Sequence, residues 1–248
     1  MRRLFVLAER WREPHAVVEG EAHRHLARVL RARAGDTLTL FDGQGHEVDA
    51  VVVAVERQRT TLALGTPRTA APAAGARVVL LQSLARGERM DWIVQKATEL
   101  GVAEIVPVAA ERSVARLSAR EAPARRARWE KIAREAARQC GRADVPIIAD
   151  PIPLSAALER WRGEKRDTGA AFVLWEGSQG HPLRATLAAD ARDVALLIGP
   201  EGGFTDAEVA LAQSTGFQVA GLGPRILRVE TAAIVAVALA QFATGGLD

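Results

Sequence analysis

The sequence predicts an α/β protein in which a small β-barrel-like module precedes a larger domain built on a parallel sheet. Three observations lead to this prediction. The first 70 residues contain several short strand patterns separated by turn residues. Residues 66–75 are rich in alanine and proline, which is typical of a linker. From residue 76 onward strand and helix patterns alternate, an order that favours parallel strands with helices on both faces.

The strands of the front module are marked by alternation and by a turn. Asp42, Gly43 and Gly45 form a strong turn signal between two apolar segments. The expected strands are residues 36–41, 48–55 and 60–64. Together they predict a small β-barrel-like module.

One helix is expected in this module, at residues 21–33. Leu26, Val29 and Leu30 fall on one face at helical spacing. The opposite face carries Arg24, Arg28 and Arg31. The pattern therefore predicts an amphipathic helix with a basic outer surface.

The second domain shows an unbroken apolar run at residues 194–198, which is typical of a buried parallel strand. Gly101 and Gly141 stand where C-caps of two helices are expected. The expected strands are 78–81, 105–108, 171–175, 194–198 and 218–222. The expected helices are 88–100, 124–140, 154–161, 205–214 and 230–242.

Composition excludes several classes of protein. The chain has 248 residues, of which 48% are hydrophobic and 25% charged, a globular balance. Its longest apolar run, residues 231–243, is shorter than the roughly 20 residues of a membrane-spanning helix. Glu9 and Arg10 interrupt the N-terminal apolar stretch too early for a signal peptide. Cys140 is the only cysteine, so a reducing, cytoplasmic location is expected. The histidines show no metal-ligand spacing with it or with one another, so no metal is expected.

Positive charge is concentrated in the middle of the chain. The formal net charge is +3, and the only lysines are Lys96, Lys131 and Lys165, so arginine supplies nearly all of the positive charge. Basic side chains outnumber acidic ones in residues 110–145, whereas acidic ones predominate after residue 146. A basic patch of this kind indicates either a polyanionic partner or one solvated helix face.

The first candidate site lies between the strand at 194–198 and the helix that follows. Its sequence, IGPEGGF, contains two adjacent glycines that let the backbone approach a ligand and leave main-chain groups free. Thr205 and Glu208 have capping-box spacing, which marks the start of the helix. Ligands bind at the carboxyl ends of strands in open α/β sheets. A tight turn without a ligand is the alternative.

The second candidate site is the connection at residues 222–232, LGPRILRVETA. Arg225 and Arg228 flank the apolar pair Ile226 and Leu227, which predicts an apolar pocket with two cations at its rim. The alternative is a loop with two solvated arginines. The helix after it has almost no polar face, so it must be buried in the core or at a subunit interface.

Four motifs in this order closely resemble the RsmE family, the bacterial small-subunit rRNA uridine-N3 methyltransferases of the SPOUT class. They are ERMDWIVQKATELGV, RWEKIAREAARQCGR, IGPEGGF and LGPRILRVETA. The resemblance covers nearly the whole chain. It implies a PUA-like RNA-binding barrel at residues 1–70 and a SPOUT domain with a trefoil knot at residues 76–248.

The resemblance also implies that the knot binds S-adenosylmethionine and that two chains form a dimer through the final helix. A third part of the binding site would be the loop after residue 175, including Gly177. The implied cofactor-binding residues are Leu174, Trp175, Glu176, Ile198, Gly199, Pro200, Glu201, Gly202, Leu222, Gly223, Ile226, Leu227, Arg228 and Thr231.

Methyl transfer to uridine N3 requires loss of the N3 proton and stabilisation of charge on the uracil oxygens. Arg228 is the expected cation, and Arg225 is expected to position a phosphate or the base. Either Glu230 or Glu201 is the expected general base, although Glu230 is also placed to cap its helix.

The expected partner is 16S rRNA or the small ribosomal subunit. Its expected contacts are Arg2, Arg3, Arg24, Arg28, Arg31 and Arg33, with Arg125, Arg126 and Arg128 behind them. Three other functions remain open: a SPOUT enzyme with another RNA target, a non-catalytic RNA-binding or ribosome-assembly protein, and a small-molecule enzyme with a nucleotide pocket.

Overall fold

The computed structural model describes residues 2–11, 14–71, 74–114, 118, 120–163, 169–176 and 181–247. The chain divides into two compact units. Unit 1 comprises Met1–Pro72 and Arg134–Val145, and unit 2 comprises Ala73–Ala133 and Pro146–Asp248. The sequence predicts a single division of the chain, near residues 70–76. Residues 134–145 belong to unit 1 because they bind its loops: Val145 N–H donates to Gly43 O at 2.9 Å, and Gly45 N–H donates to Ala143 O at 3.3 Å.

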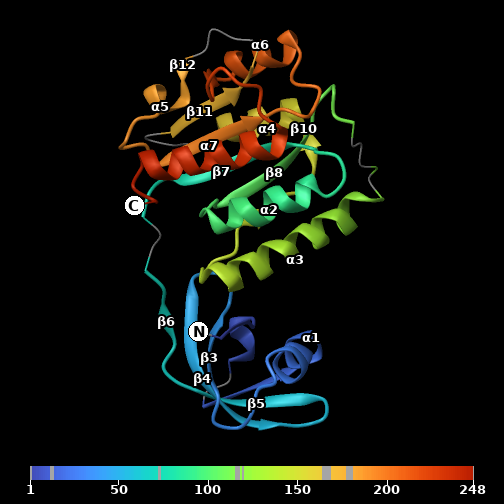
Figure 1. The fold of residues 1–248 in the computed structure, drawn as a ribbon, viewed down its shortest axis with the longest axis vertical. Helices are drawn as coiled ribbons and strands as arrows, with labels where there is room; N and C mark the ends of the chain where they lie inside the picture. The colour runs from blue at the N-terminus through green and yellow to red at the C-terminus, as the bar shows by residue number, and fades with distance from the viewer. Residues whose placement is uncertain are drawn as a thin grey trace. The chain divides into compact units, whose positions relative to one another are not determined.

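Unit 1 is built on a six-stranded sheet in the order β1-β3-β4-β5-β2, with β6 paired to β4 (Figure 1). Its strands are β1 (Arg3–Phe5), β2 (His15–Glu19), β3 (Thr37–Phe41), β4 (His46–Val55), β5 (Arg59–Leu64) and β6 (Arg68–Thr69). The side chains of Leu40, Val48 and Leu62 alternate with polar ones and fill the core. β6 lies inside the segment predicted as a linker, so that prediction is wrong there. A short 3-10 helix, η1 (Ala8–Arg10), follows β1.

The helix of unit 1 is shorter than its pattern predicts. α1 (Gly20–Arg24) continues into a π-helical turn, η2 (His25–Val29). Within this wider turn Leu26 is buried but Val29 is 67% exposed, so the two do not share one face as in a regular α-helix. Arg31 then adopts a φ of 49°, which ends the helix before the predicted residue 33.

Unit 2 contains a parallel sheet in the order β10-β8-β7-β13-β11-β14-β12, with β9 paired to β8. Its strands are β7 (Arg77–Ser83), β8 (Glu104–Ala109), β9 (Ile147–Ile148), β10 (Ile152–Pro153), β11 (Gly169–Leu174), β12 (His181–Pro182), β13 (Asp193–Ile198) and β14 (Gln218–Gly221). The strand β13 lies between β7 and β11, with Leu197 opposite Leu81 on one side and Val173 on the other. Burial on both faces explains its unbroken apolar sequence.

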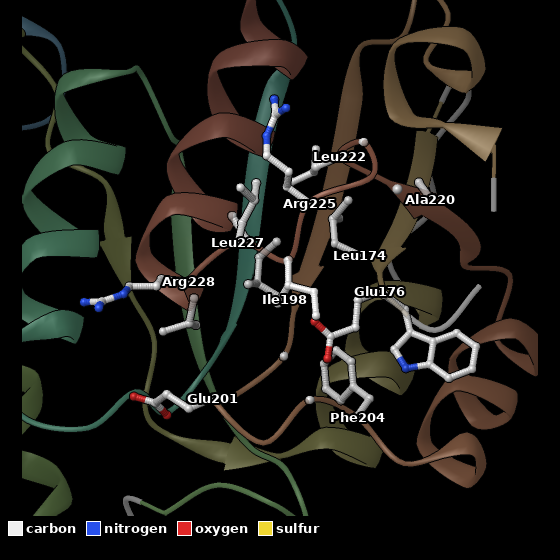
Figure 2. A pocket seen from close by; sticks show the side chains of 18 of the residues that line it. Leu174, Glu176, Ile198, Glu201, Phe204, Ala220, Leu222, Arg225, Leu227 and Arg228 are labelled. Atoms are coloured by element: carbon white, nitrogen blue, oxygen red, sulfur yellow. The ribbon is translucent and has the colours of Figure 1, made fainter. Parts of the chain in front are cut away.

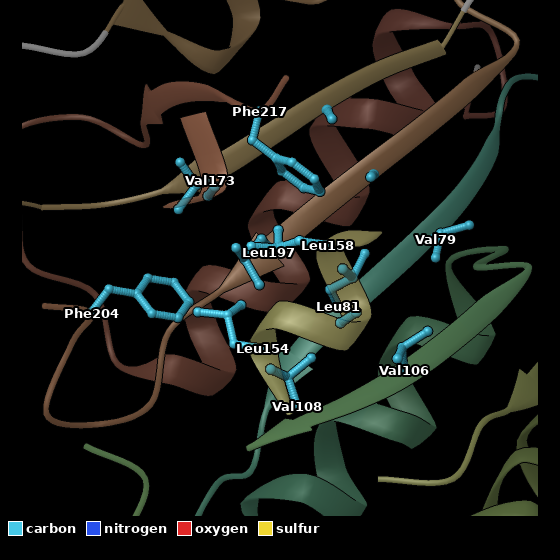
Figure 3. Close-up of a cluster of buried hydrophobic side chains, with 14 of the residues drawn as sticks. Val79, Leu81, Val106, Val108, Leu154, Leu158, Val173, Leu197, Phe204 and Phe217 are labelled. Atoms are coloured by element: carbon cyan, nitrogen blue, oxygen red, sulfur yellow. The ribbon is translucent and has the colours of Figure 1, made fainter. Parts of the chain in front are cut away.

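Helices cover both faces of this sheet, as predicted. They are α2 (Arg89–Glu99), α4 (Leu154–Gly163), α5 (Leu183–Thr186), α6 (Asp206–Ser214) and α7 (Val229–Ala243). A further helix, α3 (Ala122–Cys140), begins in unit 2 and ends in unit 1. α2 and α7 pack together, and α7 contacts β7 and β13 (Figure 1). On the opposite face Leu154 and Leu158 of α4 pack with strand residues and with Phe204 and Phe217 (Figure 3).

The final helix α7 is buried on one side only. Ala233, Ala236 and Val237 are buried against the sheet, whereas Phe242 is 70% exposed. Within one chain the helix is therefore not covered all round. None of the helices in the described part of the chain is long and apolar enough to cross a membrane.

Candidate functional site

A cavity of about 630 Å³ lies at the carboxyl ends of β11, β13 and β14 (Figure 2). These strands are neighbours in the sheet, so the segments that leave them meet at one edge. The lining residues are Arg89, Leu174, Trp175, Glu176, Pro182, Ile198, Gly199, Pro200, Glu201, Gly203, Phe204, Ala220, Gly221, Leu222, Gly223, Pro224, Arg225, Ile226, Leu227, Arg228, Val229, Glu230 and Ala232. We call residues 199–205 the first loop and residues 222–228 the second loop.

The first loop is fixed by hydrogen bonds at both ends. Gly203 N–H donates to Pro200 O at 2.9 Å, which closes a turn with Gly203 at a φ of 68°. The Thr205 hydroxyl accepts from Glu208 N–H at 3.3 Å, and the Glu208 carboxylate accepts from Thr205 N–H at 2.9 Å. This capping box, predicted from the sequence, starts α6.

Glu201 ties the first loop to the start of α2. Its Oε1 accepts hydrogen bonds from Arg86 N–H at 2.9 Å and from Arg89 Nη1 at 2.5 Å. Burial opposes ionisation, but the hydrogen bonds from the backbone and from Arg89 outweigh it and lower the pKa of Glu201. A carboxylate held in its ionised form in this way is a poor proton acceptor.

The second loop is open. Gly223 has a φ of 105°, which favours glycine, and no atom lies within 4 Å of a Cβ built there. Ile226 is 80% exposed. Arg225 and Arg228 are also exposed, and neither has an ion pair among the described residues. In Figure 2 Arg228 and Glu201 lie on the same side of the cavity, whereas Arg225 points away from them.

Glu230 lines the cavity from the first turn of α7. Its side chain is 19% exposed, and the helix dipole favours a negative charge at this position. Its Oε2 is buried and has no hydrogen-bond partner in the described part of the chain. The nearest cation is Arg89, whose Nε lies 3.8 Å away, beyond hydrogen-bonding distance.

Most of the predicted binding residues line this cavity, but Gly202 and Thr231 do not. Gly202 faces the segment after β8: its carbonyl accepts from Arg112 Nη1 at 3.3 Å, and a Cβ built on it would lie 3.0 Å from the Arg112 Cβ. Thr231 is exposed on the outer side of α7. Gly177 lies outside the described residues.

The sequence predictions missed several lining residues, of which Arg89 and Phe204 are the most informative. Phe204 belongs to the IGPEGGF motif, and its ring packs into the core cluster under the first loop. Arg89 stands in the ERMDW motif, far from both loops in sequence. The motif was a signal for it, but its contact with Glu201 depends on the tertiary fold.

The arginines predicted to bind RNA fall into two groups. Arg2 pairs with Asp36 at 2.5 Å, Arg3 pairs with Glu47, and Arg126 and Arg128 pair with acidic residues of unit 2. The second group is exposed and has no ion pair among the residues that the structure describes; it comprises Arg24, Arg28, Arg31, Arg33 and Arg125. The described residues contain no group of three or more His, Cys, Asp or Glu side chains arranged to hold a metal ion.

Models of known protein families match both parts of the chain. A family model described as an RNA methyltransferase domain matches residues 72–241, and one described as an RNA methyltransferase PUA domain matches residues 18–63. The α/β fold with an N-terminal PUA domain is therefore confirmed.

Curated relatives match over most of the chain. The ribosomal RNA small subunit methyltransferase E of Bacillus subtilis is 32% identical over 237 residues, which cover 93% of this chain and 91% of that protein. The Mycobacterium tuberculosis protein of the same name is 32% identical over 94% of this chain and 88% of its own length. The crystal structure of the Neisseria gonorrhoeae protein of that name, bound to S-adenosyl methionine, has a TM-score of 0.85 and 31% identity, with 98% of this chain and 97% of that chain covered. The chain therefore belongs to the ribosomal RNA small subunit methyltransferase E family, RsmE.

Proposed function

We propose that the protein transfers a methyl group from S-adenosylmethionine to N3 of a uridine in the 16S rRNA of the small ribosomal subunit. Among the features of the site, the one that carries this proposal is Glu230. Its buried Oε2 has no hydrogen-bond partner in the described structure, and Glu230 lines the same cavity as the exposed Arg228. The family to which the chain belongs supports the reaction and the class of RNA.

The cavity fits S-adenosylmethionine in size and in chemistry. Its volume lies in the range of pockets for small ligands. The side chains of Leu174, Ile198 and Leu227 supply apolar surface for a flat adenine ring, and the backbone around Gly199 and Gly223 supplies polar groups at close range. Nearby carboxylates suit the positive charge of a sulfonium. Glu176 points into this space toward Phe204 (Figure 2).

The residues of the chain then perform the proton chemistry. Bound S-adenosylmethionine supplies an electrophilic methyl carbon, so that the N3–carbon bond forms as the carbon–sulfur bond breaks and sulfur keeps the electron pair. Glu230 accepts the N3 proton through a carboxylate oxygen, which frees the nitrogen lone pair. Arg228 stabilises the negative charge that develops on the uracil oxygens. Arg225 positions the phosphate or the base.

Glu230 is favoured over Glu201 as the base. Glu201 already accepts two hydrogen bonds at one oxygen, and its pKa is lowered, so it holds the first loop instead. Glu230 keeps an acceptor that no group of the described chain uses. An unpaired buried acceptor costs free energy, which a substrate N–H would recover.

Unit 1 would hold the RNA through its exposed arginines. Arg24 and Arg28 lie on or beside the π-helical turn, and Arg31 and Arg33 follow it. Guanidinium groups bind phosphates through bidentate contacts. Arg2, Arg3, Arg126 and Arg128 are less available because each has an acidic partner.

We also propose the trefoil knot, the dimer and the cytoplasmic location that the family resemblance implies. β13 lies between β7 and β11, β14 lies beyond β11, and α7 returns to β7 and β13, and this return of the chain end to the central strands supports the knot. Phe242 of α7 is apolar but exposed, and such an exposed apolar side chain supports a partner subunit at this helix. An enzyme of ribosomal RNA would act in the cytoplasm.

The test uses purified protein, labelled S-adenosylmethionine and small ribosomal subunits from cells that lack this methylation. We expect N3-methyluridine in 16S rRNA, identified by mass spectrometry of the nucleosides. Glu230→Gln should lower the single-turnover rate by about 100-fold and leave the affinity for S-adenosylmethionine nearly unchanged.

Glu159→Gln is the control because Glu159 is exposed and pairs only loosely with Arg162, at 3.6 Å. A different methylated nucleoside would indicate another target atom or RNA. Donor binding without transfer to any RNA would indicate a non-catalytic RNA-binding protein.

A further inference from the structure

Arg89 occupies a position between two carboxylates of the site. It is the first residue of α2, and it lines the cavity together with Glu201 and Glu230. Its Nη1 donates to Glu201 at 2.5 Å, whereas its Nε lies 3.8 Å from Glu230 Oε2. One guanidinium thus faces two acids and bonds to only one of them.

Arg89 Nε and Glu230 Oε2 place a hydrogen-bond donor and an acceptor side by side, with no hydrogen bond between them. Glu230 Oε2 is buried and has no hydrogen-bond partner among the described residues, because its ion pair with Arg89 Nε, at 3.8 Å, is longer than a hydrogen bond. Unsatisfied buried acceptors are uncommon in proteins, and a bound molecule is one explanation for them. A molecule that satisfies both groups must present a hydrogen-bond donor beside an acceptor, and an N–H next to a carbonyl oxygen is one such pattern.

Uracil presents this pattern on its Watson–Crick edge, because N3–H lies directly beside the ring carbonyls. Resting on the function proposed above, we propose that Arg89 and Glu230 together recognise the imide edge of the target uridine and exclude cytidine. Glu230 accepts from N3–H, and Arg89 donates to the O4 carbonyl oxygen, the position that carries the amino group in cytosine, while it keeps its bond to Glu201. Arg89 is thereby a specificity-determining residue that the motif of the second loop does not contain.

Cytosine meets repulsion at both positions. Its N3 carries a lone pair instead of a proton, so it would face the carboxylate of Glu230. Its amino group would face the guanidinium of Arg89. Neither buried group would be satisfied, and enzymes reject analogues strongly when their buried polar groups remain unpaired. The discrimination should therefore appear in binding, before any methyl transfer.

Arg89 has an alternative, purely structural role, which is to hold Glu201 and the first loop. That role would affect every RNA equally, because it does not depend on the base in the cavity. The ratio of affinities for uridine and cytidine at the target position therefore separates the two roles. Arg86 offers a matched control, because it is an exposed arginine near the same loop that contacts Glu201 only through its backbone N–H.

The experiment measures binding of small subunits reconstituted with 16S rRNA that carries either uridine or cytidine at the methylated position. S-adenosylhomocysteine is present so that no transfer occurs. We expect the wild-type protein to prefer uridine by about tenfold or more. Arg89→Ala and Glu230→Gln should bring this ratio to within about threefold of one, and Arg86→Ala should keep the wild-type ratio even if overall affinity falls.

Arg89→Lys guards against a folding defect, because it keeps the charge beside Glu201. A single ammonium on a flexible stem lacks the planar fork, so the ratio should fall in this variant too. A ratio that stays at the wild-type value in Arg89→Lys and Glu230→Gln would overturn the inference while the proposed function stands. Failure of the wild-type protein to methylate any uridine would instead overturn the proposed function, and this inference with it.

Discussion

The two loops that form the cavity differ in how firmly the protein holds them. The first loop is bonded to α2 through Glu201, to the segment after β8 through Gly202, and to its own helix through Thr205. The second loop has exposed residues from Gly223 to Ile226 and no side-chain hydrogen bond within the described structure. Both loops join a parallel strand to a helix at the same edge of the sheet, so topology does not explain the difference.

The difference between the loops matches the ligand that each is proposed to bind. A firmly held loop presents backbone groups in a fixed geometry, which reduces the entropic cost of binding a small donor molecule. An open loop with two unpaired arginines leaves its charges available for a polyanion that arrives later. We therefore expect substitutions in the second loop to affect the binding of ligands and turnover, and substitutions of the side chains that fasten the first loop to affect mainly stability.

The largest expected effect is that of Arg228→Ala, which removes the cation from the second loop. The single-turnover rate of methylation should fall by about 100-fold, because the charge that develops on the uracil oxygens loses one of its stabilising cations. Arg112→Ala is the matched control, since within the described structure the Arg112 side chain donates only to the first loop, at Gly202 O. Equal losses in the two variants would show that the loops do not differ in function.

A smaller effect is expected for Gly223→Ala, also in the second loop. Alanine at a φ of 105° is strained, so the affinity for S-adenosylmethionine, measured by calorimetry, should fall by about tenfold. Gly216→Ala tests strain alone, because Gly216 has a φ of 96°, open space around its Cβ and no place in the cavity. We expect Gly216→Ala to lower the stability of the protein and to leave its affinity for S-adenosylmethionine unchanged. If Gly216→Ala and Gly223→Ala lose the same affinity, backbone strain alone explains the loss.

The sequence predicts the loops well because the signals there are local. An apolar strand, adjacent glycines and a capping box all lie within residues 194–208, and each has one dominant structural meaning. The contact of Arg89 with Glu201 has no such signal, because a crossover and several strands separate the two residues in the chain. Which carboxylate accepts the proton likewise depends on tertiary hydrogen bonds that no spacing reveals.

The elements that the sequence misses are those whose pattern fits another structure. Val29 fits a regular α-helix, and only the π-helical turn exposes it. β6 and β12 have two residues each, too few for any periodicity. The assignment of residues 134–145 to unit 1 depends on bonds to the loop at Gly43, a hundred residues earlier.

The smallest expected effect is that of Glu201→Gln in the first loop, and it depends on pH. The pKa of Glu201 is lowered from its ordinary value of 4.5, so the ionised carboxylate stabilises the folded protein at neutral pH. The variant should lose about 1 kcal/mol in the free energy of unfolding at pH 7, with single-turnover methylation within about threefold of the wild type. This difference from the wild type should stay constant above about pH 5 and shrink as the pH falls through the lowered pKa, because the wild-type carboxylate then becomes neutral as well. Urea unfolding at several pH values measures it, with Glu159→Gln as the control for an exposed ion pair. A large loss of turnover without loss of stability would mean that Glu201 takes part in the chemistry and that the firmly held loop is as much a part of the substrate site as the open one.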